Sequence, residues 1–343
     1  MAKVVVAFNR IHPETLDSRP VDTMAESDTE ETINNLKAAI ESGGHSVELL
    51  EADENIFEQL KKAQPEIVFN IAEGLRGESR ESHIPVVCEM LDIHYTGSGP
   101  LTLALCLNKA RTKEILLHYN ISTPKFQVLQ RVDQPLNPDL HYPLIVKLLQ
   151  EGSSMGVSEK SIVSDAAALK EQISFLFNTY HEPLLVEEFI EGREFTVGVM
   201  GNAKPRVLPI TELVFSKPRG IVIFTPDAEM IERYPQLWKD GIPQPMHRSV
   251  CPAEVPPELK TAIEKTAVEA YRALGCRDWC RMEMRLAADG KLYVLELNPI
   301  AGIDASYWLP RAAMIGGQTY AEFVNEILDH ALARRNHNNH KSQ

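Results

Sequence analysis

The sequence predicts an α/β protein, with α+β character in parts, that opens on a βαβ unit with a parallel sheet. Strand and helix patterns alternate through the first 95 residues, as in βαβ units. A loop rich in glycine and serine directly follows a predicted strand over Leu144–Lys147. Two alternating apolar stretches also flank Asp289-Gly290, which is a strong hairpin signal.

The first unit, residues 1–100, begins with a predicted strand over Val4–Phe8, and a loop over residues 9–27 follows. Ser27-Asp28-Thr29-Glu30 has the capping-box pattern that opens a helix, and Gly43-Gly44 is typical of a helix end. Strands are expected at Val47–Leu50 and Ile67–Asn70, around a helix that contains Ile56 and Leu60. This order favours a parallel sheet covered by helices.

The second unit, residues 101–192, is expected to contain a helix over residues 101–119, the strand Leu144–Lys147, a helix from Ser164-Asp165 and a strand over Leu184–Phe189. The third unit, residues 193–333, should begin with strands at Phe195–Met200 and Val207–Pro209, and an irregular stretch over residues 216–257 should follow. A helix over Glu258–Leu274, the hairpin and a terminal helix are expected after it. The polar residues 334–343 are expected to form a disordered tail.

The composition excludes several functions. With 35 basic and 48 acidic residues the net charge is −13, which argues against non-specific binding to nucleic acid or anionic membranes. No apolar run approaches the length of a membrane span. The five cysteines include no Cys-x-x-Cys pair. Reduced structural thiols in a cytoplasmic protein therefore fit best, and a zinc site is disfavoured.

The predicted hairpin can assemble a metal site. Arg281, Glu283 and Arg285 share one face of the first strand, and Glu296 and Asn298 share a face of the second, because side chains alternate along a strand. If the register brings these faces together, two carboxylates and an amide oxygen converge, a set that suits Mg²⁺. The alternative is a solvated face of an ordinary hairpin with an Arg–Glu pair.

The loop after Lys147 has the composition of a phosphate-binding loop. Gly152 and Gly156 let backbone N–H groups approach a phosphate, and Ser153 and Ser154 add hydroxyl donors. The segment matches neither Gly-x-x-x-x-Gly-Lys-Ser/Thr nor Gly-x-Gly-x-x-Gly, so the two best-known nucleotide signatures are absent. A surface turn with an exposed lysine is the alternative.

Taken in order, these segments resemble the ATP-grasp superfamily, and specifically the D-alanine–D-alanine ligases. The resemblance implies the three-domain ATP-grasp fold of those enzymes, and it extends from about residue 67 to 313. The matching segments are Tyr95-Thr96-Gly97-Ser98-Gly99, Asn108-Lys109, Lys147 with Glu151-Gly152-Ser153-Ser154-Met155-Gly156-Val157, residues 186–197, Arg281-Met282-Glu283, Glu296-Leu297-Asn298, Gly302 and Leu309-Pro310.

The resemblance implies a role for each matched residue. Lys109 and Lys147 would hold the phosphates of ATP while the loop Gly152–Gly156, including Met155, closes over them. Glu194 would meet the ribose hydroxyls, and the adenine would contact Glu187, Glu188, Phe189 and Ile190. Two Mg²⁺ ions, with Mn²⁺ as an alternative, would be bound by Glu283, Glu296 and Asn298. The catalytic residues would be Arg281, Ser153 and Lys147.

The implied reaction is the ATP-dependent joining of a small carboxylate to an amino acid, with ADP and phosphate released. ATP converts the carboxylate to an acyl phosphate, and an amine then attacks that anhydride. Arg281 and the loop amides would stabilise the developing oxyanion. The resemblance also implies a cytoplasmic enzyme and a homodimer, with no nucleic-acid or membrane partner.

The chain departs from the family where the substrates should bind. A longer loop replaces the usual Gly-Gly-x-Ser-x-Glu; its acids Glu14, Glu26 and Asp28 are candidates, although ordinary loop and helix-cap acids are favoured. A charged segment that follows Phe69 contributes Glu73 and Arg80 as candidate substrate residues. After Gly302, Asp304 and Tyr307 replace hydroxyl-bearing residues, and Asp304 would attract an amine. Tyr307 is a candidate substrate residue, with a core aromatic as the alternative, and the neighbouring Trp308 is expected to be a core aromatic.

Three functions follow. The leading prediction is a carboxylate–amine ligase, forming a peptide, amide or amidine-type bond, with a nonstandard substrate pair in a natural-product pathway, as in the ligases that join amino acids to a mycosporine core. The alternative is an authentic D-alanine–D-alanine ligase of peptidoglycan synthesis. The third is a noncatalytic nucleotide-binding module, which the presence of Arg281 and every predicted metal ligand disfavours.

Overall fold

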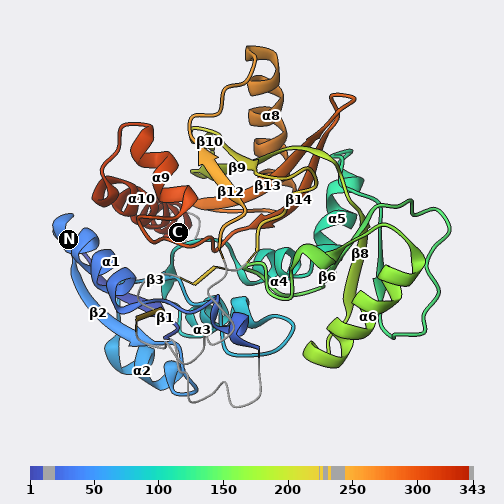
Figure 1. Ribbon diagram of the computed structural model, residues 1–343. Coiled ribbons are helices and arrows are strands. Elements are labelled where there is room, and N and C mark those ends of the chain that lie inside the picture. Colours follow the sequence, from blue (N-terminus) through green and yellow to red (C-terminus); the bar gives the residue numbers. More distant parts are fainter. Residues whose placement is uncertain (11–19, 224, 227–230, 233–243, 340–343) are drawn as a thin grey trace.

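The computed structural model describes residues 1–10, 20–223, 225–226, 231–232 and 244–339, and it confirms the mixed α/β class (Figure 1). Its described residues form three sheets, one of four parallel strands, one of four antiparallel strands and one of six antiparallel strands. The three sheets follow one another along the chain in the order of the three predicted units. The boundaries at residues 100, 192 and 333 themselves stay predictions.

The N-terminal sheet is parallel, as the βαβ pattern predicts. Its order is β2 (Ser46–Glu51), β1 (Lys3–Phe8), β3 (Ile67–Asn70) and β4 (His94–Tyr95). The helices of this unit are α1 (Glu30–Ser42), α2 (Ile56–Ala63) and α3 (His83–Met90). The predicted capping box at Ser27 is wrong by two residues, because the side chain of Thr29 accepts the N–H of Thr32 and α1 begins at Glu30.

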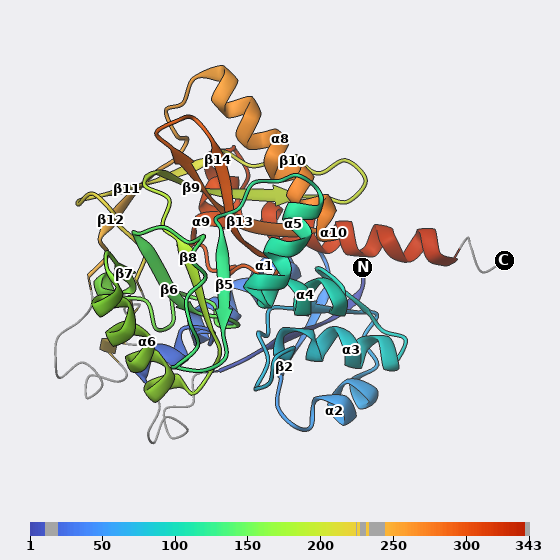
Figure 2. The ribbon, with the colours of Figure 1, turned by 90° about the vertical axis from the view of Figure 1, so that its right-hand side faces the viewer.

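The central sheet has the order β5 (Phe126–Leu129), β8 (Leu184–Glu188), β6 (Leu144–Leu148), β7 (Ile162–Val163), and α6 (Ala166–Tyr180) packs against it (Figure 2). The single helix expected over residues 101–119 is two helices, α4 (Pro100–Leu107) and α5 (Lys109–His118). They separate at Asn108, whose backbone is extended and whose side chain accepts the N–H of Arg111. This break turns Lys109 into the first residue of a new helix.

The C-terminal sheet carries the predicted hairpin. Its main path is β12 (His247–Val250), β11 (Thr211–Phe215), β9 (Gly192–Met200), β13 (Trp279–Ala287) and β14 (Leu292–Asn298), and β10 (Arg206–Val207) pairs with β9. β12 lies in the stretch that we expected to be irregular. The helices are α8 (Pro257–Ala273), α9 (Trp308–Ile315) and α10 (Tyr320–Asn339). The expected tail from residue 334 is therefore wrong at its start, because α10 continues to Asn339.

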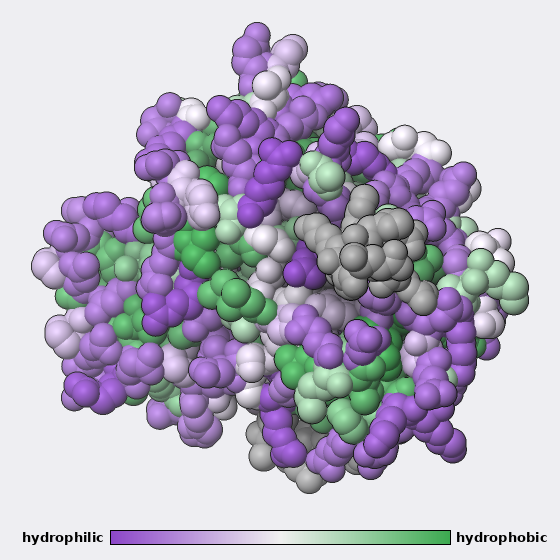
Figure 3. Space-filling view, turned by 180° about the vertical axis from the view of Figure 1, so that it is seen from behind, coloured by the Kyte–Doolittle hydropathy of each residue, from purple (hydrophilic) through white to green (hydrophobic). Residues whose placement is uncertain are grey.

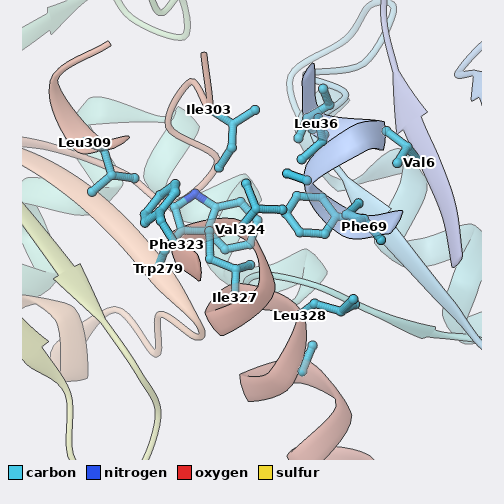
Figure 4. Packing of buried hydrophobic residues seen from close by; sticks show 14 of the residues in the cluster. Val6, Leu36, Phe69, Trp279, Ile303, Leu309, Phe323, Val324, Ile327 and Leu328 are labelled. Atoms are coloured by element: carbon cyan, nitrogen blue, oxygen red, sulfur yellow. The ribbon is translucent and has the colours of Figure 1, made fainter. Parts of the chain in front are cut away.

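One hydrophobic core joins the first and last units of the chain. Apolar side chains of the parallel sheet and α1 pack directly against side chains of β13, the segment after β14, and α10 (Figure 4). Its labelled members include Val6, Leu36, Phe69, Trp279, Phe323 and Ile327. This contact fixes the N-terminal unit beside residues 300–307, where the substrate site is expected.

The surface agrees with the acidic composition. The face in Figure 3 is mostly hydrophilic, with smaller apolar patches between the polar residues. Among the described residues, we find no helix whose length and apolar character would let it cross a membrane.

Candidate active site

The hairpin register confirms the predicted juxtaposition of polar residues. Arg281 lies opposite Asn298 and Glu283 lies opposite Glu296, with a bulge directly after Glu283. On its other side β13 pairs with β9, where Glu283 lies opposite Thr196 and Arg285 opposite Glu194. The strand pairs therefore bring the expected metal ligands and Glu194 onto one sheet.

A cavity of about 400 Å³ lies where the three units meet, and it collects most of the predicted site. The predicted residues that line it are Glu73, Lys109, Lys147, Gly152, Ser153, Ser154, Met155, Glu187, Glu188, Phe189, Ile190, Glu194, Arg281, Glu283, Glu296, Asn298, Gly302 and Tyr307. Three predicted residues, Arg80, Gly156 and Asp304, are not part of its lining.

Lysines occupy the end of the cavity at which phosphates were predicted. Lys109 at the start of α5 donates to the carbonyl oxygen of Glu151, and its Nζ lies 3.9 Å from Glu296 Oε2. Lys147 on β6 donates to Glu187 Oε1 at 2.8 Å. Glu187 on β8 is also 2.6 Å from the Nζ of Lys113, which sequence reasoning missed. The lysines therefore present positive charge around the buried carboxylate of Glu187 and the partly exposed carboxylate of Glu296.

The charge of Glu187 is fixed by these lysines. Burial alone disfavours its ionised form, but the ammonium groups of Lys113 and Lys147 outweigh burial and lower the pKa of Glu187 to about 2. The pKa of Lys113 is lowered because its complete burial outweighs the attraction of Glu187. A sequence signal for Lys113 existed, since it lies four residues after Lys109 and thus on the same face of α5.

The loop after β6 has the backbone of an anion-binding turn. Ser153, Ser154 and Gly156 adopt left-handed conformations, with φ of 48°, 60° and 70°. The N–H of Gly152 donates to Glu26 Oε1 at 2.9 Å, and the N–H of Gly156 donates to Asp22 Oδ2 at 2.8 Å. Both amides therefore already donate to carboxylate oxygens, which is the chemistry that a phosphate would use.

The expected metal ligands fit a divalent cation. Glu283 is 7% exposed, and its Oε2 is buried with no hydrogen-bond partner among the described residues. Burial, together with the carboxylates of Glu296 and Glu194, raises the pKa of Glu283 to about 7 against the opposing effect of Arg281. A cation would stabilise this carboxylate. Asn298 Oδ1 accepts the N–H of Ile300 and keeps a second lone pair.

A bound divalent ion there would neutralise phosphate charge. Among the described residues, no group of three or more His, Cys, Asp and Glu side chains is placed to hold a metal. The predicted set, with two carboxylates and one amide, therefore needs further oxygen ligands from water or a nucleotide, as is usual for Mg²⁺.

Arg285, expected only to share a strand face with Arg281 and Glu283, fixes the residues predicted to bind the nucleoside. Its guanidinium pairs with Glu194 at 2.5 Å, donates to the carbonyl oxygens of Ile190 and Gly220, and lies 4.4 Å from the centroid of the Phe189 ring. These contacts fix the carboxylate that was predicted to bind ribose. They also connect it to the segment that was predicted to contact adenine.

Arg281 lies between the metal site and an aromatic wall. Its Nε is 2.8 Å from Glu283 Oε1, and its guanidinium lies 5.1 Å from the centroid of the Trp308 ring. Trp308 donates from its indole nitrogen to Ser249 Oγ at 2.9 Å and lines the cavity. The expectation that Trp308 is a core aromatic is therefore wrong: it is half-buried and positions Arg281.

A smaller cavity of about 30 Å³ adjoins the main one between the N-terminal unit and residues 300–307. Four carboxylates, those of Glu26, Asp28, Glu73 and Asp304, line it, and no described lysine or arginine does. Burial raises the pKa of Asp28 to about 8, although the N–H of Asn9 opposes this. Asp304 Oδ2 accepts from Thr32 Oγ1 at 3.0 Å. This end of the site is acidic.

Tyr307 borders both cavities. Its side chain is 45% exposed, so the alternative in which it is a core aromatic is wrong. The ring lies over Gly302, where an added Cβ would come within 2.3 Å of a ring carbon. Gly302 thus lets the phenol lie at the boundary between the two cavities.

Arg80 has a different place from the predicted substrate residue. Its side chain is 8% exposed, with Glu26 and Glu151 carboxylate oxygens at 2.7 and 2.9 Å. It also donates to the carbonyl oxygen of Gln150. Arg80 therefore ties the N-terminal loop to the phosphate loop instead of facing either cavity. Glu14 lies outside the described residues.

Comparisons with known proteins place this chain in a family. Residues 115–329 match the family model described as D-ala D-ala ligase C-terminus. The D-alanine–D-alanine ligase of Erythrobacter litoralis is 32% identical over 86% of this chain and 85% of its own length. An uncharacterised protein of Sinorhizobium fredii is 30% identical over 96% of this chain and 94% of its own length.

Solved structures have the same fold. A D-alanine–D-alanine ligase from Bacillus anthracis complexed with ATP matches with a TM-score of 0.74 and 23% identity, over 98% of this chain and all of its own. The VanG D-Ala:D-Ser ligase from Enterococcus faecalis matches with a TM-score of 0.71 and 19% identity, over 96% of this chain and 99% of its own. The chain belongs to the D-alanine–D-alanine ligase family of ATP-dependent ligases.

Proposed function

We propose that the protein joins a small carboxylic acid to an amino acid through an acyl phosphate, using ATP and Mg²⁺, with a substrate pair other than two D-alanines. The observation that carries this proposal is the contrast within one site. Lysines, the phosphate loop and the Glu283–Glu296–Asn298 set converge on the main cavity, whereas the adjoining cavity is lined by four carboxylates.

The residues supply the steps that such a reaction needs. Lys109, Lys147 and the loop amides would orient the phosphates of ATP. Glu283, Glu296 and Asn298 would hold a divalent ion, which would supply the charge that neutralises those phosphates. Arg281, held between Glu283 and Trp308, faces the same cavity. Its guanidinium would stabilise the oxyanion that forms when an amine attacks the acyl phosphate.

The acidic lining of the smaller cavity supports a nonstandard substrate. An acceptor such as D-alanine has a single amine, which attacks the acyl phosphate, so its carboxylate would need a positively charged partner. The described lining of the smaller cavity has no lysine or arginine. Glu26 there is already paired with Arg80, which leaves the acids Asp28, Glu73 and Asp304. A substrate with an additional amine would instead pair with them. We therefore favour a natural-product pathway, with an amine-bearing substrate beside Asp304.

The second candidate is an authentic D-alanine–D-alanine ligase. The names of several relatives favour it, since proteins about 30% identical over most of this chain carry that name. The two candidates share the nucleotide chemistry and differ only in the substrates that trigger phosphate release.

The test is phosphate release by the purified protein with MgATP, over a panel of D-amino acids, L-amino acids, diamines and small carboxylic acids, with products identified by mass. Release with a pair other than two D-alanines would support the leading proposal. If D-alanine alone gave the highest rate of phosphate release in the panel, the result would support the second candidate, an authentic D-alanine–D-alanine ligase. No ATP consumption with any pair would count against both.

Finer properties belong to the same proposal. We propose two bound Mg²⁺ ions, with Mn²⁺ able to replace them, a homodimer and a cytoplasmic location. Activity titrated against each metal, light scattering of the purified protein and fractionation of the host cells test these three points.

A further inference from the structure

Lys113 lies beneath the nucleotide end of the site without reaching it. It belongs to α5, its side chain is 0% exposed, and it is not among the residues that line the main cavity. Its Nζ is 2.6 Å from Glu187 Oε2 and donates to Thr123 Oγ1 at 2.8 Å. A fully buried lysine is rare unless its charge is compensated.

Glu187 is shared between this lysine and Lys147. Lys147 Nζ is 2.8 Å from the other carboxylate oxygen, Oε1, and its side chain is 18% exposed and lines the cavity. One carboxylate therefore faces two ammonium groups, and the trio carries one net positive charge. The exposed member of the trio is Lys147.

Burial decides where that charge can act. Lys113 has no access to the cavity, so its ammonium can compensate Glu187 but cannot contact a ligand. Lys147 can do both. Without Lys113, the carboxylate of Glu187 would have Lys147 as its close counter-charge, and this ammonium would then be less available to an incoming anion.

We propose that Lys113 is a positioning residue that neutralises Glu187 and thereby leaves the positive charge of Lys147 available to bind the phosphates of ATP. This inference rests on the nucleotide-binding part of the proposed function and is independent of which substrates are joined. If Lys113 served only to pack α5 against β8, its loss would lower the affinities for MgATP and for adenosine alike.

The test is a double-mutant cycle on the full-length protein, read out by calorimetric binding of MgATP. Lys113→Met should weaken MgATP binding by about tenfold, the effect of one charge-assisted contact. In the Glu187→Gln background the same substitution should cost no more than about twofold, because no carboxylate then competes for Lys147. Adenosine has no phosphates, so Lys113→Met should leave its affinity unchanged both in the wild-type background and in the Glu187→Gln background.

Controls keep the result interpretable. Arg111→Met removes a positive charge from the same helix at a 62%-exposed side chain paired with Glu114, and it should leave MgATP binding unchanged. Lys113→Gln, which removes the charge but keeps a hydrogen-bond donor to Thr123, serves if Lys113→Met does not fold.

Three results would overturn the proposal. They are unchanged MgATP affinity in folded Lys113→Met or Lys113→Gln, equal losses in both Glu187 backgrounds, and a parallel loss of adenosine affinity. If the wild-type protein does not bind MgATP, the nucleotide assignment itself fails, and this outcome is distinct from the other three. Failure to find substrates would leave the binding cycle intact.

Discussion

Two carboxylates at opposite ends of the site respond to burial in opposite ways. Glu187 has a pKa of about 2, because two ammonium groups outweigh its burial. Asp28 has a pKa of about 8, because burial dominates and a single backbone N–H opposes it. The end of the cavity predicted to bind ATP therefore carries positive charge that can balance the charge of the phosphates. The acceptor end holds acids whose compensation must come from a proton or a cationic substrate.

The acids and lysines at the two ends also differ in whether their segments match the family. The compensated residues Lys109, Lys147, Glu187 and Glu296 lie in segments that match the family. The uncompensated ones, Asp28, Glu73 and Asp304, lie in segments that depart from it. Common ATP chemistry with a divergent acceptor would produce this division.

The largest expected effect comes from replacing one of the predicted metal ligands at the end of the cavity predicted to bind ATP. Glu296→Gln should lower ATP-dependent phosphate release by roughly 10³-fold or more, since a metal contributes several kcal/mol to phosphoryl transfer. Steady-state assays at saturating Mg²⁺ measure this. The matched control is Glu264→Gln, which changes a partly exposed acid of α8 that is paired with Lys260. Near wild-type turnover in Glu296→Gln would refute the assignment of Glu296 as a metal ligand.

A second, smaller effect is expected at Lys147. Lys147→Ala should weaken MgATP binding by about tenfold to 100-fold, because it removes a charge-assisted contact to phosphate. Calorimetry with MgATP measures the loss, and Lys265→Ala on the exposed face of α8 should show none. Equal affinities for the two variants would mean that Lys147 does not contact the nucleotide.

The acceptor end should affect selectivity more than ATP affinity. Asp304→Thr and Tyr307→Ser should each change the ranking of acceptors by about tenfold in kcat/KM, the effect of one polar contact in a pocket. ATP affinity should stay within about twofold, since neither residue belongs to the phosphate or adenine contacts. Uniform losses over all acceptors, together with weaker ATP binding, would show instead that the two residues are structural.

The smallest expected effect is a change in how stability depends on pH. The folded protein binds a proton at Asp28 that the unfolded chain releases above its ordinary pKa of 3.8, so this group costs stability as pH rises from about 4 to about 8. Asp28→Asn should flatten that decline in thermal unfolding scans. Asp92→Asn, at an exposed left-handed residue with φ of 54°, is the control; parallel curves for wild type and Asp28→Asn would contradict the burial of a protonated Asp28.

Alternation and turn signals are local, and they predicted the hairpin and which of its side chains share a face. The register that places Glu283 opposite Glu296 came from the structure. The parallel N-terminal sheet also followed from its strand–helix order. Other features depend on contacts that are distant in sequence. The break at Asn108, the strand β12 and the pairing of Arg80 with Glu26 and Glu151 required the packed structure.

The buried charges show the same limit. Lys113 shares a helix face with Lys109, and Arg285 shares a strand face with Glu283. Only the structure, however, places Glu187 and Glu194 beside them and thereby shows what the two charges compensate. Trp308, which was expected in the core, instead packs against the guanidinium of Arg281. Sequence reasoning therefore predicted residues that the structure gathers around one cavity, but it did not predict how their charges are compensated.

The most direct test of the account is the rate of phosphate release with MgATP when D-alanine is the sole amino acid, compared with the best pair from a panel that includes amine-bearing substrates. We expect D-alanine alone to give turnover well below about 1 per second, the lower end of ordinary enzyme rates, and an amine-bearing pair to exceed it. D-alanyl-D-alanine formation within the ordinary range of roughly 1–10³ per second, unmatched by any other pair, would contradict the divergent acceptor end.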